Sequence, residues 1–197
     1  MRVLVACECS GMVRDAFRFR GHDAWSCDLQ PSEGVGEFYH LLGDCLSHLD
    51  GPWDLLIAHP PCTFLCNSGA VWLHQKNKQK ALDRLMQMDR AAKFFLKLWN
   101  APILRIAIEN PIMHGYAKKS IGVRQSQLIQ PWMFGHPESK ATCLWLKNLP
   151  LLKPTKIEPF HYQWSQSRPP SSHRSKDRSE TLPGIASAMA DQWGSME

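Results

Sequence analysis

The sequence predicts a single α/β domain with a mostly parallel β-sheet and helices on both of its faces. Two observations support this prediction. Short apolar runs alternate with segments of helical character from Arg2 to Pro111, an order typical of parallel sheets. A polar or acidic residue follows most of the apolar runs, as expected where the carboxyl ends of parallel strands form a ligand site.

The first half of the expected domain begins with a strand, a helix and a second strand. Arg2–Cys7 is a short β-branched run and therefore a strand. Ser10 is a good N-cap for a helix that Gly21 would end. The chain then returns through a strand at Asp23–Cys27, which ends at Asp28.

The next elements continue the alternation. Asp44 precedes a short helical stretch, and Trp53–Ala58 reads as a buried strand. Residues 75–99 carry apolar side chains at steps of three and four, which predicts a helix. Arg105–Ile108 is a strand that we expect to end at Glu109, and Thr142–Leu146 is a further strand.

The end of the chain differs in composition from the rest. Residues 149–181 are rich in proline and basic residues and show little periodicity, and residues 182–194 read as a closing helix. The chain has 197 residues, 44% of them hydrophobic, which suits one domain over residues 1–197 with one substantial core.

Composition also limits the class of protein. No stretch approaches the roughly 18 apolar residues that span a bilayer, and the N-terminal apolar run lacks a typical cleavage site. We therefore expect a cytoplasmic protein with no membrane partner. The formal net charge of +5 permits a nucleic-acid partner.

The cysteines indicate reduced thiols. Seven is an odd number, and several lie in or beside apolar runs, which suits a reducing compartment better than a disulfide framework. Cys62-x3-Cys66 and Cys7-x-Cys9 lack the paired spacing of a zinc ribbon. We expect no metal ion.

Five reactive or acidic side chains come from five separate elements of this plan. They are Glu8, Asp28, Asp44, Cys62 and Glu109. The carboxyl ends of parallel strands meet at one edge of a sheet, so we expect these groups to gather there. One such residue is ordinary, but five together favour a functional site over packing.

The motifs and their order resemble those of the cytosine-C5 DNA methyltransferases, a branch of the Rossmann-like, S-adenosylmethionine-dependent methyltransferase fold. The sequence PPC at residues 60–62 is similar to the family's nucleophile motif. ENP at residues 109–111 is similar to its Glu-Asn motif, and TLPGIASAMA at residues 181–190 resembles the small-residue motif that closes the cofactor pocket. The resemblance spans most of the chain in the family's order.

The resemblance implies S-adenosylmethionine as cofactor, DNA as substrate, Cys62 as nucleophile and Glu109 as the acid that meets N3 of cytosine. The residues that it places at the cofactor are Glu8, Cys9, Ser10, Gly11, Asp28, Leu29, Asp44, Pro60 and Ser187. The candidates for substrate contact are Asn110, Lys140, Arg168, Arg174 and Arg178.

The chemistry of the reaction explains why Cys62 and Glu109 would occur together. Cytosine C5 accepts a methyl group only after a thiolate has added to C6 and made the ring an enamine. This addition needs an accessible cysteine in an electropositive setting and an acid at N3. Pro60 and Pro61 stiffen the chain before the sulfur and remove two backbone donors.

One departure from the family concerns the recognition of DNA. Only residues 147–181 lie between the last expected strand and the closing helix, which leaves no room for a large recognition domain. The substrate would then be single-stranded DNA, a flipped base or a short duplex site. Specificity would come from the loop at residues 63–75, from the proline-rich segment, or from a second subunit in a homodimer.

Several residues have an alternative structural interpretation. Asp28 could cap a turn, and Asp44 could be a plain helix N-cap. His59 could be a satisfied turn histidine or lie near a substrate phosphate. Cys66 and Cys143 are read as bystanders to Cys62.

Other functions remain open on the sequence alone. N4-cytosine and N6-adenine methyltransferases use a Pro-Pro-aromatic motif, whereas HPPC at residues 59–62 has neither an acidic residue before the prolines nor an aromatic residue after them. A C5 enzyme acting on free cytidine nucleotides is a related option. A third is a catalytically degenerate module of the same fold that binds nucleic acid.

Overall fold

The protein is built on one seven-stranded sheet. The computed structural model describes residues 1–34, 36–67, 77–159, 162–163 and 181–196. The strands of the sheet are β1 (Arg2–Ala6), β2 (Asp23–Asp28), β3 (His40–Leu42), β4 (Leu55–Ala58), β5 (Arg105–Pro111), β6 (Gln127–Ile129) and β8 (Thr142–Lys147). Their order across the sheet is β3-β2-β1-β4-β5-β8-β6.

The five strands from β3 to β5 are parallel, and β8 runs antiparallel to both of its neighbours. A mostly parallel sheet is therefore confirmed. A separate two-residue ladder joins β7 (Glu138–Ser139) to β9 (Tyr162–Gln163). No helix in the described part of the chain is long and apolar enough to cross a membrane.

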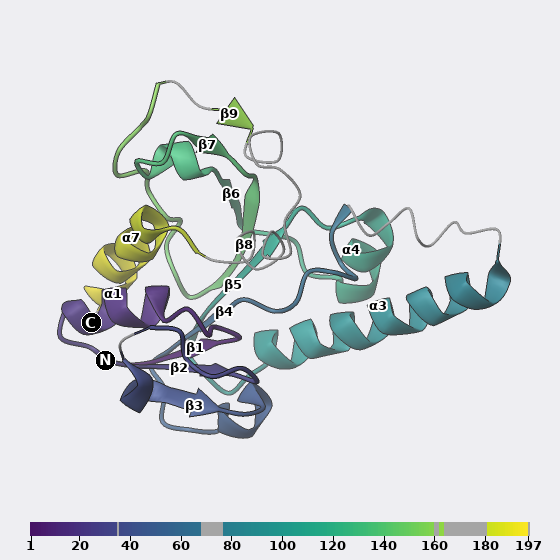
Figure 1. Cartoon of the computed structure of the whole chain (residues 1–197), viewed down its shortest axis with the longest axis horizontal. Helices are drawn as coiled ribbons and strands as arrows, with labels where there is room; N and C mark the ends of the chain where they lie inside the picture. The colour runs from purple at the N-terminus through teal and green to yellow at the C-terminus, as the bar shows by residue number, and fades with distance from the viewer. Residues whose placement is uncertain (35, 68–76, 160–161, 164–180, 197) are drawn as a thin grey trace.

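Helices cover both faces of the sheet (Figure 1). On one face lie α1 (Met12–Phe19) and α7 (Pro183–Gly194), and on the other α3 (Lys78–Trp99) and α4 (Gly115–Ile121). Short 3₁₀ helices complete the structure at η1 (Glu37–Tyr39), η2 (Cys45–His48) and η4 (Pro131–Met133).

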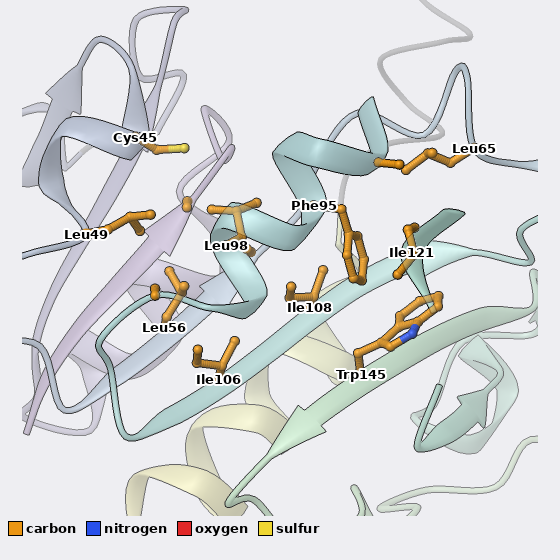
Figure 2. Close-up of a cluster of buried hydrophobic side chains, with 14 of the residues drawn as sticks. Cys45, Leu49, Leu56, Leu65, Phe95, Leu98, Ile106, Ile108, Ile121 and Trp145 are labelled. Carbon is orange, nitrogen blue, oxygen red and sulfur yellow. The ribbon is translucent and has the colours of Figure 1, made fainter. Parts of the chain in front are cut away.

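Strand alternation divides the interior into two cores. Leu4, Leu56, Ile106 and Ile108 pack toward α3 and α4, whereas their neighbours in the same strands face α1 and α7, because successive side chains point to opposite faces. Figure 2 shows the first core. Phe95 of α3 meets the Trp145 ring edge-on there, with ring centroids 5.2 Å apart.

The helix α1 begins differently from the expectation that Ser10 would cap it. Gly11 is the N-cap residue, with a φ of 74°, a left-handed conformation that suits glycine. The buried carboxylate of Glu8 accepts hydrogen bonds from the amides of Val13, at 2.7 Å, and Arg14, at 3.2 Å. A side chain from the preceding loop therefore satisfies the first turn.

The sequence also placed the end of β5 too early. The strand continues through Glu109 and Asn110 to Pro111, because these residues pair with Leu144 and Cys143 of the antiparallel β8. β3 and β6 have three residues each and α4 has seven, too short to show a clear period. The closing helix is confirmed as α7.

Replacing Phe95 with alanine should destabilise the protein by about 3–5 kcal/mol, since it removes a fully buried ring and leaves a cavity against Trp145. The matched control is Phe19→Ala, because Phe19 is 90% exposed and its loss should change stability by no more than about 0.5 kcal/mol. Urea unfolding measures both. Equal effects of the two substitutions would contradict this core.

Candidate functional site

The predicted acidic and reactive groups gather at the carboxyl edge of the parallel strands. Glu8 follows β1, and Asp28 is the last residue of β2. Segment 59–62 follows β4, and Glu109 lies near the end of β5. The register pairs β4 directly with β5 as parallel neighbours, so the segment that carries Cys62 lies beside Glu109 and Asn110.

Local hydrogen bonds fix the backbone around Cys62. The amide of His59 donates to the carbonyl of Ala6 at 2.9 Å, before the two prolines. The side-chain amide of Asn110 donates to the carbonyl of Pro60 at 2.8 Å. After Cys62 the chain turns, and its carbonyl accepts from the amides of Leu65 and Cys66. The nucleophile candidate is therefore held on both sides.

His59 and Glu109 form a buried pair at the centre of the site. Nδ1 of His59 lies 2.9 Å from Oε2 of Glu109, and the two side chains are 9% and 15% exposed. Burial alone would raise the pKa of Glu109, but the hydrogen bond and charge of His59, together with the charge of Lys140, bring that pKa below its ordinary value. Glu109 is thus ionised here.

The surroundings of Cys62 differ from the electropositive setting expected of a nucleophile. A hydrogen bond with Cys66, burial and the negative charge of Glu109 raise the pKa of the Cys62 thiol well above its ordinary value. Within the residues described, no basic side chain is among the causes that shift it. Cys62 is a thiol in this state and needs activation before it can attack.

Two carboxylates at the same edge are candidates to hold a cofactor. Asp28 Oδ1 accepts from the amide of Gln30 at 2.9 Å, and Asp44 Oδ1 accepts from the amide of Leu46 at 3.0 Å. Both aspartates are therefore local caps, as the structural interpretation held. Their Oδ2 atoms accept no hydrogen bond from the described residues, so the pair fits the hydroxyl and amine donors of an adenosine group.

The loop before α1 has fewer groups available for a cofactor than the resemblance implies, because its residues are engaged in contacts within the protein. A side chain at Gly11 would overlap the guanidinium of Arg14, which is fully buried, so the glycine makes room for this arginine. The carbonyl of Cys9 accepts from the amide of Glu33 at 2.8 Å, and the hydroxyl of Ser10 accepts from the amide of Met12.

The remaining residues expected at the cofactor lie in different surroundings. Glu8 is engaged in capping α1, as described above, and Leu29 is 77% exposed beside Asp28. The hydroxyl of Ser187 accepts a hydrogen bond from Arg20, beyond the C-terminal end of α1. Ser187 is therefore bonded to α1 in this structure, and its place at the cofactor stays a prediction.

Lys140 is the substrate candidate that the structure brings close to the centre. Its charge acts on both His59 and Glu109. A hollow of about 10 Å³ beside Glu109 is lined by Lys140, Thr142 and Pro131, by Thr181 and Leu182 just before α7, and by Ile185 in its first turn. This is about the space of one water molecule, so a cytosine ring would need its walls to move. Arg168, Arg174 and Arg178 lie outside the described residues.

Sequence reasoning missed the parts played by His59 and Cys66. The sequence leaves His59 open between a turn histidine and a residue near a substrate phosphate, whereas the structure shows it as the direct partner of Glu109. Cys66 lies four residues after Cys62, and this spacing in a helical turn brings both side chains to one side. In the described ranges, no group of three or more His, Cys, Asp and Glu side chains is arranged to hold a metal ion.

The solved structures that resemble this chain are methyltransferases at low sequence identity. EhMeth of Entamoeba histolytica matches with a TM-score of 0.52 and 17% identity, over 80% of this chain and 57% of its own. A candidate DNA modification methyltransferase of an E. coli prophage matches with 0.49 and 14%, over 82% and 53%. Dnmt2 of S. pombe gives 0.44 and 13%, over 84% and 52%.

The likeness to EhMeth establishes the fold. The sheet has the Rossmann-like methyltransferase architecture, as the match to EhMeth shows. The chain spans a little over half the length of the structures it matches. No family model matches the sequence, and no curated protein matches it either.

The pair of His59 and Glu109 should make stability depend on pH. Burial opposes the charge of His59, but Glu109 and Glu8 raise its pKa, so its contribution is full below the ordinary value of 6.5 and is lost as pH rises through the raised value. The lowered pKa of Glu109 adds stability above 4.5 that is lost as pH falls through the lowered value.

We therefore expect Glu109→Gln to destabilise the protein most between pH 4.5 and 6.5, by on the order of 3 kcal/mol, because it breaks a buried ion pair. Urea unfolding at a series of pH values measures the difference. Glu37→Gln is the control, since Glu37 is exposed on η1. A Glu109→Gln effect that stays constant across this pH range would show that no ion pair exists.

Proposed function

We propose that this protein transfers a methyl group from S-adenosylmethionine to C5 of cytosine in DNA through a covalent adduct on Cys62. One observation carries the proposal. In a methyltransferase fold, the PPC segment after β4 and the Glu-Asn pair of β5 lie side by side, joined by the contacts of Asn110 with Pro60 and Glu109 with His59. This arrangement supports the proposal that one base could meet both a thiol and a carboxylate.

The cofactor would lie at the carboxyl ends of β1, β2 and β3. Asp28 would hold the ribose hydroxyls and Asp44 the adenine, since each keeps a carboxylate oxygen available and charge-assisted hydrogen bonds are strong. When bound, the group supplies an electrophilic methyl on a sulfonium. Cys9, Ser10 and Gly11 would border its methionine part through their backbone, beside Glu8 and Pro60.

The protein's own groups would act on the base. The Sγ atom of Cys62 adds to C6, and Glu109 meets N3 and neutralises the charge that develops there. Asn110 holds the loop of the nucleophile through Pro60, which limits the directions that the sulfur can take. Lys140 lies close enough to influence Glu109 electrostatically, and it is the residue of this segment best placed to contact the base or a phosphate.

Substrate binding must also activate Cys62. The hydrogen bond that the Cys62 thiol donates to Cys66 favours the protonated thiol, so the thiolate forms only when this contact or the surrounding charge changes. The small hollow beside Glu109 leads to the same conclusion, because a base cannot enter without local movement. The proposed substrate is a flipped or unpaired base in DNA, and we expect the site to rearrange around it.

Incubation with cofactor and DNA containing 5-fluorocytosine should trap a covalent complex that resists denaturant, because fluorine at C5 prevents elimination. Cys62→Ala should abolish the complex, whereas Cys66→Ala should retain it or form it faster, since the thiol loses the hydrogen bond that raises its pKa. Denaturing gels and intact mass spectrometry detect the adduct. Methylation that survives Cys62→Ala would instead favour an N4-cytosine or N6-adenine methyltransferase.

Asp28→Ala should weaken binding of S-adenosylmethionine by roughly 1.5–3 kcal/mol, the range for a lost hydrogen bond to a charged group. Asp28→Asn is the matched variant, because its amide oxygen can still accept from Gln30 while the charge is gone. Calorimetry should show weaker binding for both variants. Normal affinity in both, with a lower melting temperature only for Asp28→Ala, would make Asp28 a turn cap and nothing more.

A further inference from the structure

His59 is a buried titratable group to which the proposed mechanism gives no task. Its side chain is 9% exposed, and its Nδ1 is bonded to Glu109. Its other ring nitrogen, Nε2, is buried and has no hydrogen-bond partner in the structure as described. Most buried polar atoms are paired, so an imidazole with one bonded and one unbonded nitrogen is not explained by packing alone.

The charges around His59 favour its protonated form. Glu109 faces it from β5, Glu8 from the loop after β1, and Lys140 from the segment before β8. Burial opposes a charge on the ring, and so does Lys140, but the hydrogen bond to Glu109 and the charges of both glutamates raise the pKa of His59. Together with the 2.9 Å contact, these charges favour an imidazolium paired with a carboxylate.

This charge state creates a difficulty for the proposed chemistry. An ionised Glu109 has no proton to give to N3, and its pKa is lowered further by the pair itself. The proton that it lacks lies on Nδ1 of His59, and the donor and acceptor atoms are 2.9 Å apart. Transfer across one hydrogen bond of this length needs no movement of the backbone.

Resting on the function proposed above, we propose that His59 is a positioning residue that stores the proton for Glu109. It would hold the carboxylate in place while no base is bound. It would then pass its Nδ1 proton to Oε2 of Glu109 as the carboxyl group protonates N3. His59 touches no reacting atom in this scheme and acts only through Glu109.

The step balances without a further reactant. The Cys62 thiol first loses its proton to solvent. The Sγ–C6 bond then forms, the C5–C6 π pair moves to C4–C5, and the C4–N3 π pair moves to N3, which gains the proton from Glu109. His59 is left neutral. C5 would then take the methyl group with the C4–C5 π pair as the sulfonium–methyl bond breaks, and the N3 lone pair restores the C4–N3 double bond. On elimination, C5 loses its proton to solvent, the C5–H pair restores C5–C6 as the Sγ–C6 bond breaks, and the N3 proton returns through Glu109 to His59.

The first test observes His59 directly and needs no activity. Nitrogen-15 NMR of the imidazole in the free, full-length protein should show both ring nitrogens protonated at pH 7, and the signal should titrate above the ordinary value of 6.5. In Glu109→Gln the titration should move down, because burial then dominates. An imidazole that is neutral at pH 7 in the wild type overturns the inference.

The second test measures the rate of adduct formation with 5-fluorocytosine DNA against pH. In the wild type the rate should rise with pH as the Cys62 thiol loses its proton, and it should level off at the midpoint of the NMR titration of His59, because the stored proton is then lost. His59→Asn keeps a donor for Glu109 but stores no proton, so its rate should keep rising with pH through this midpoint, and below the midpoint it should react about 10²–10⁴-fold more slowly than the wild type. Its cofactor affinity should not change. His48→Asn, on η2, is the control.

The outcomes separate the two proposals. A levelling-off that persists in His59→Asn, or one that occurs in the wild type at a pH other than the midpoint of the NMR titration, overturns the role of His59 while the adduct still supports the proposed function. If the wild type forms no adduct at any pH, the proposed function fails and this role fails with it. If His59→Asn does not fold, the comparison of the two wild-type midpoints decides.

Discussion

The contacts between the ends of β4 and β5 determine where the reactive groups lie. The two strands are parallel neighbours, so the chain leaves both at the same edge. The amide of Asn110 then holds the carbonyl of Pro60, and Glu109 holds the ring of His59. Proline limits the conformations of a segment but does not set the direction in which the segment runs. These two side-chain contacts give the direction that the prolines alone would not.

The cost of this arrangement is a set of charges in a poorly solvated place. Glu8, His59 and Glu109 are all buried or nearly so, and a buried charge is tolerated only with partners. Each charge has one: Glu8 accepts from the first turn of α1, and His59 and Glu109 hold each other. Removing one partner therefore affects both the fold and the charge state of the site.

Much of the fold could be predicted because its central strands are apolar on both faces. β1, β4 and most of β5 read as continuous buried runs, and the long helix α3 has a clear period. β3 and β6 could not be predicted, since three residues show no period. The end of β5 was missed because polar residues there pair with β8, a strand remote in the sequence.

The candidate site was predictable in its location but not in its electrostatics. Parallel strands bring Cys62 and Glu109 to one edge of the sheet, and this follows from the order of strands and helices along the sequence alone. The charge of Glu109 depends on His59 and Lys140, and that of His59 depends in turn on Glu8, and these residues come from separate elements. The pKa of the Cys62 thiol depends on its hydrogen bond with Cys66, which lies one turn later in the chain. Only the folded chain brings these groups within range of each other.

The position of the methyl group on the product tests the central claim most directly. The protein would be expressed in a host without cytosine methylation, and the host DNA sequenced by a method that distinguishes C5 from N4 methylation of cytosine. The account predicts C5-methylcytosine that disappears in the Cys62→Ala variant. N4-methylcytosine or N6-methyladenine in its place, formed with or without Cys62, would contradict it.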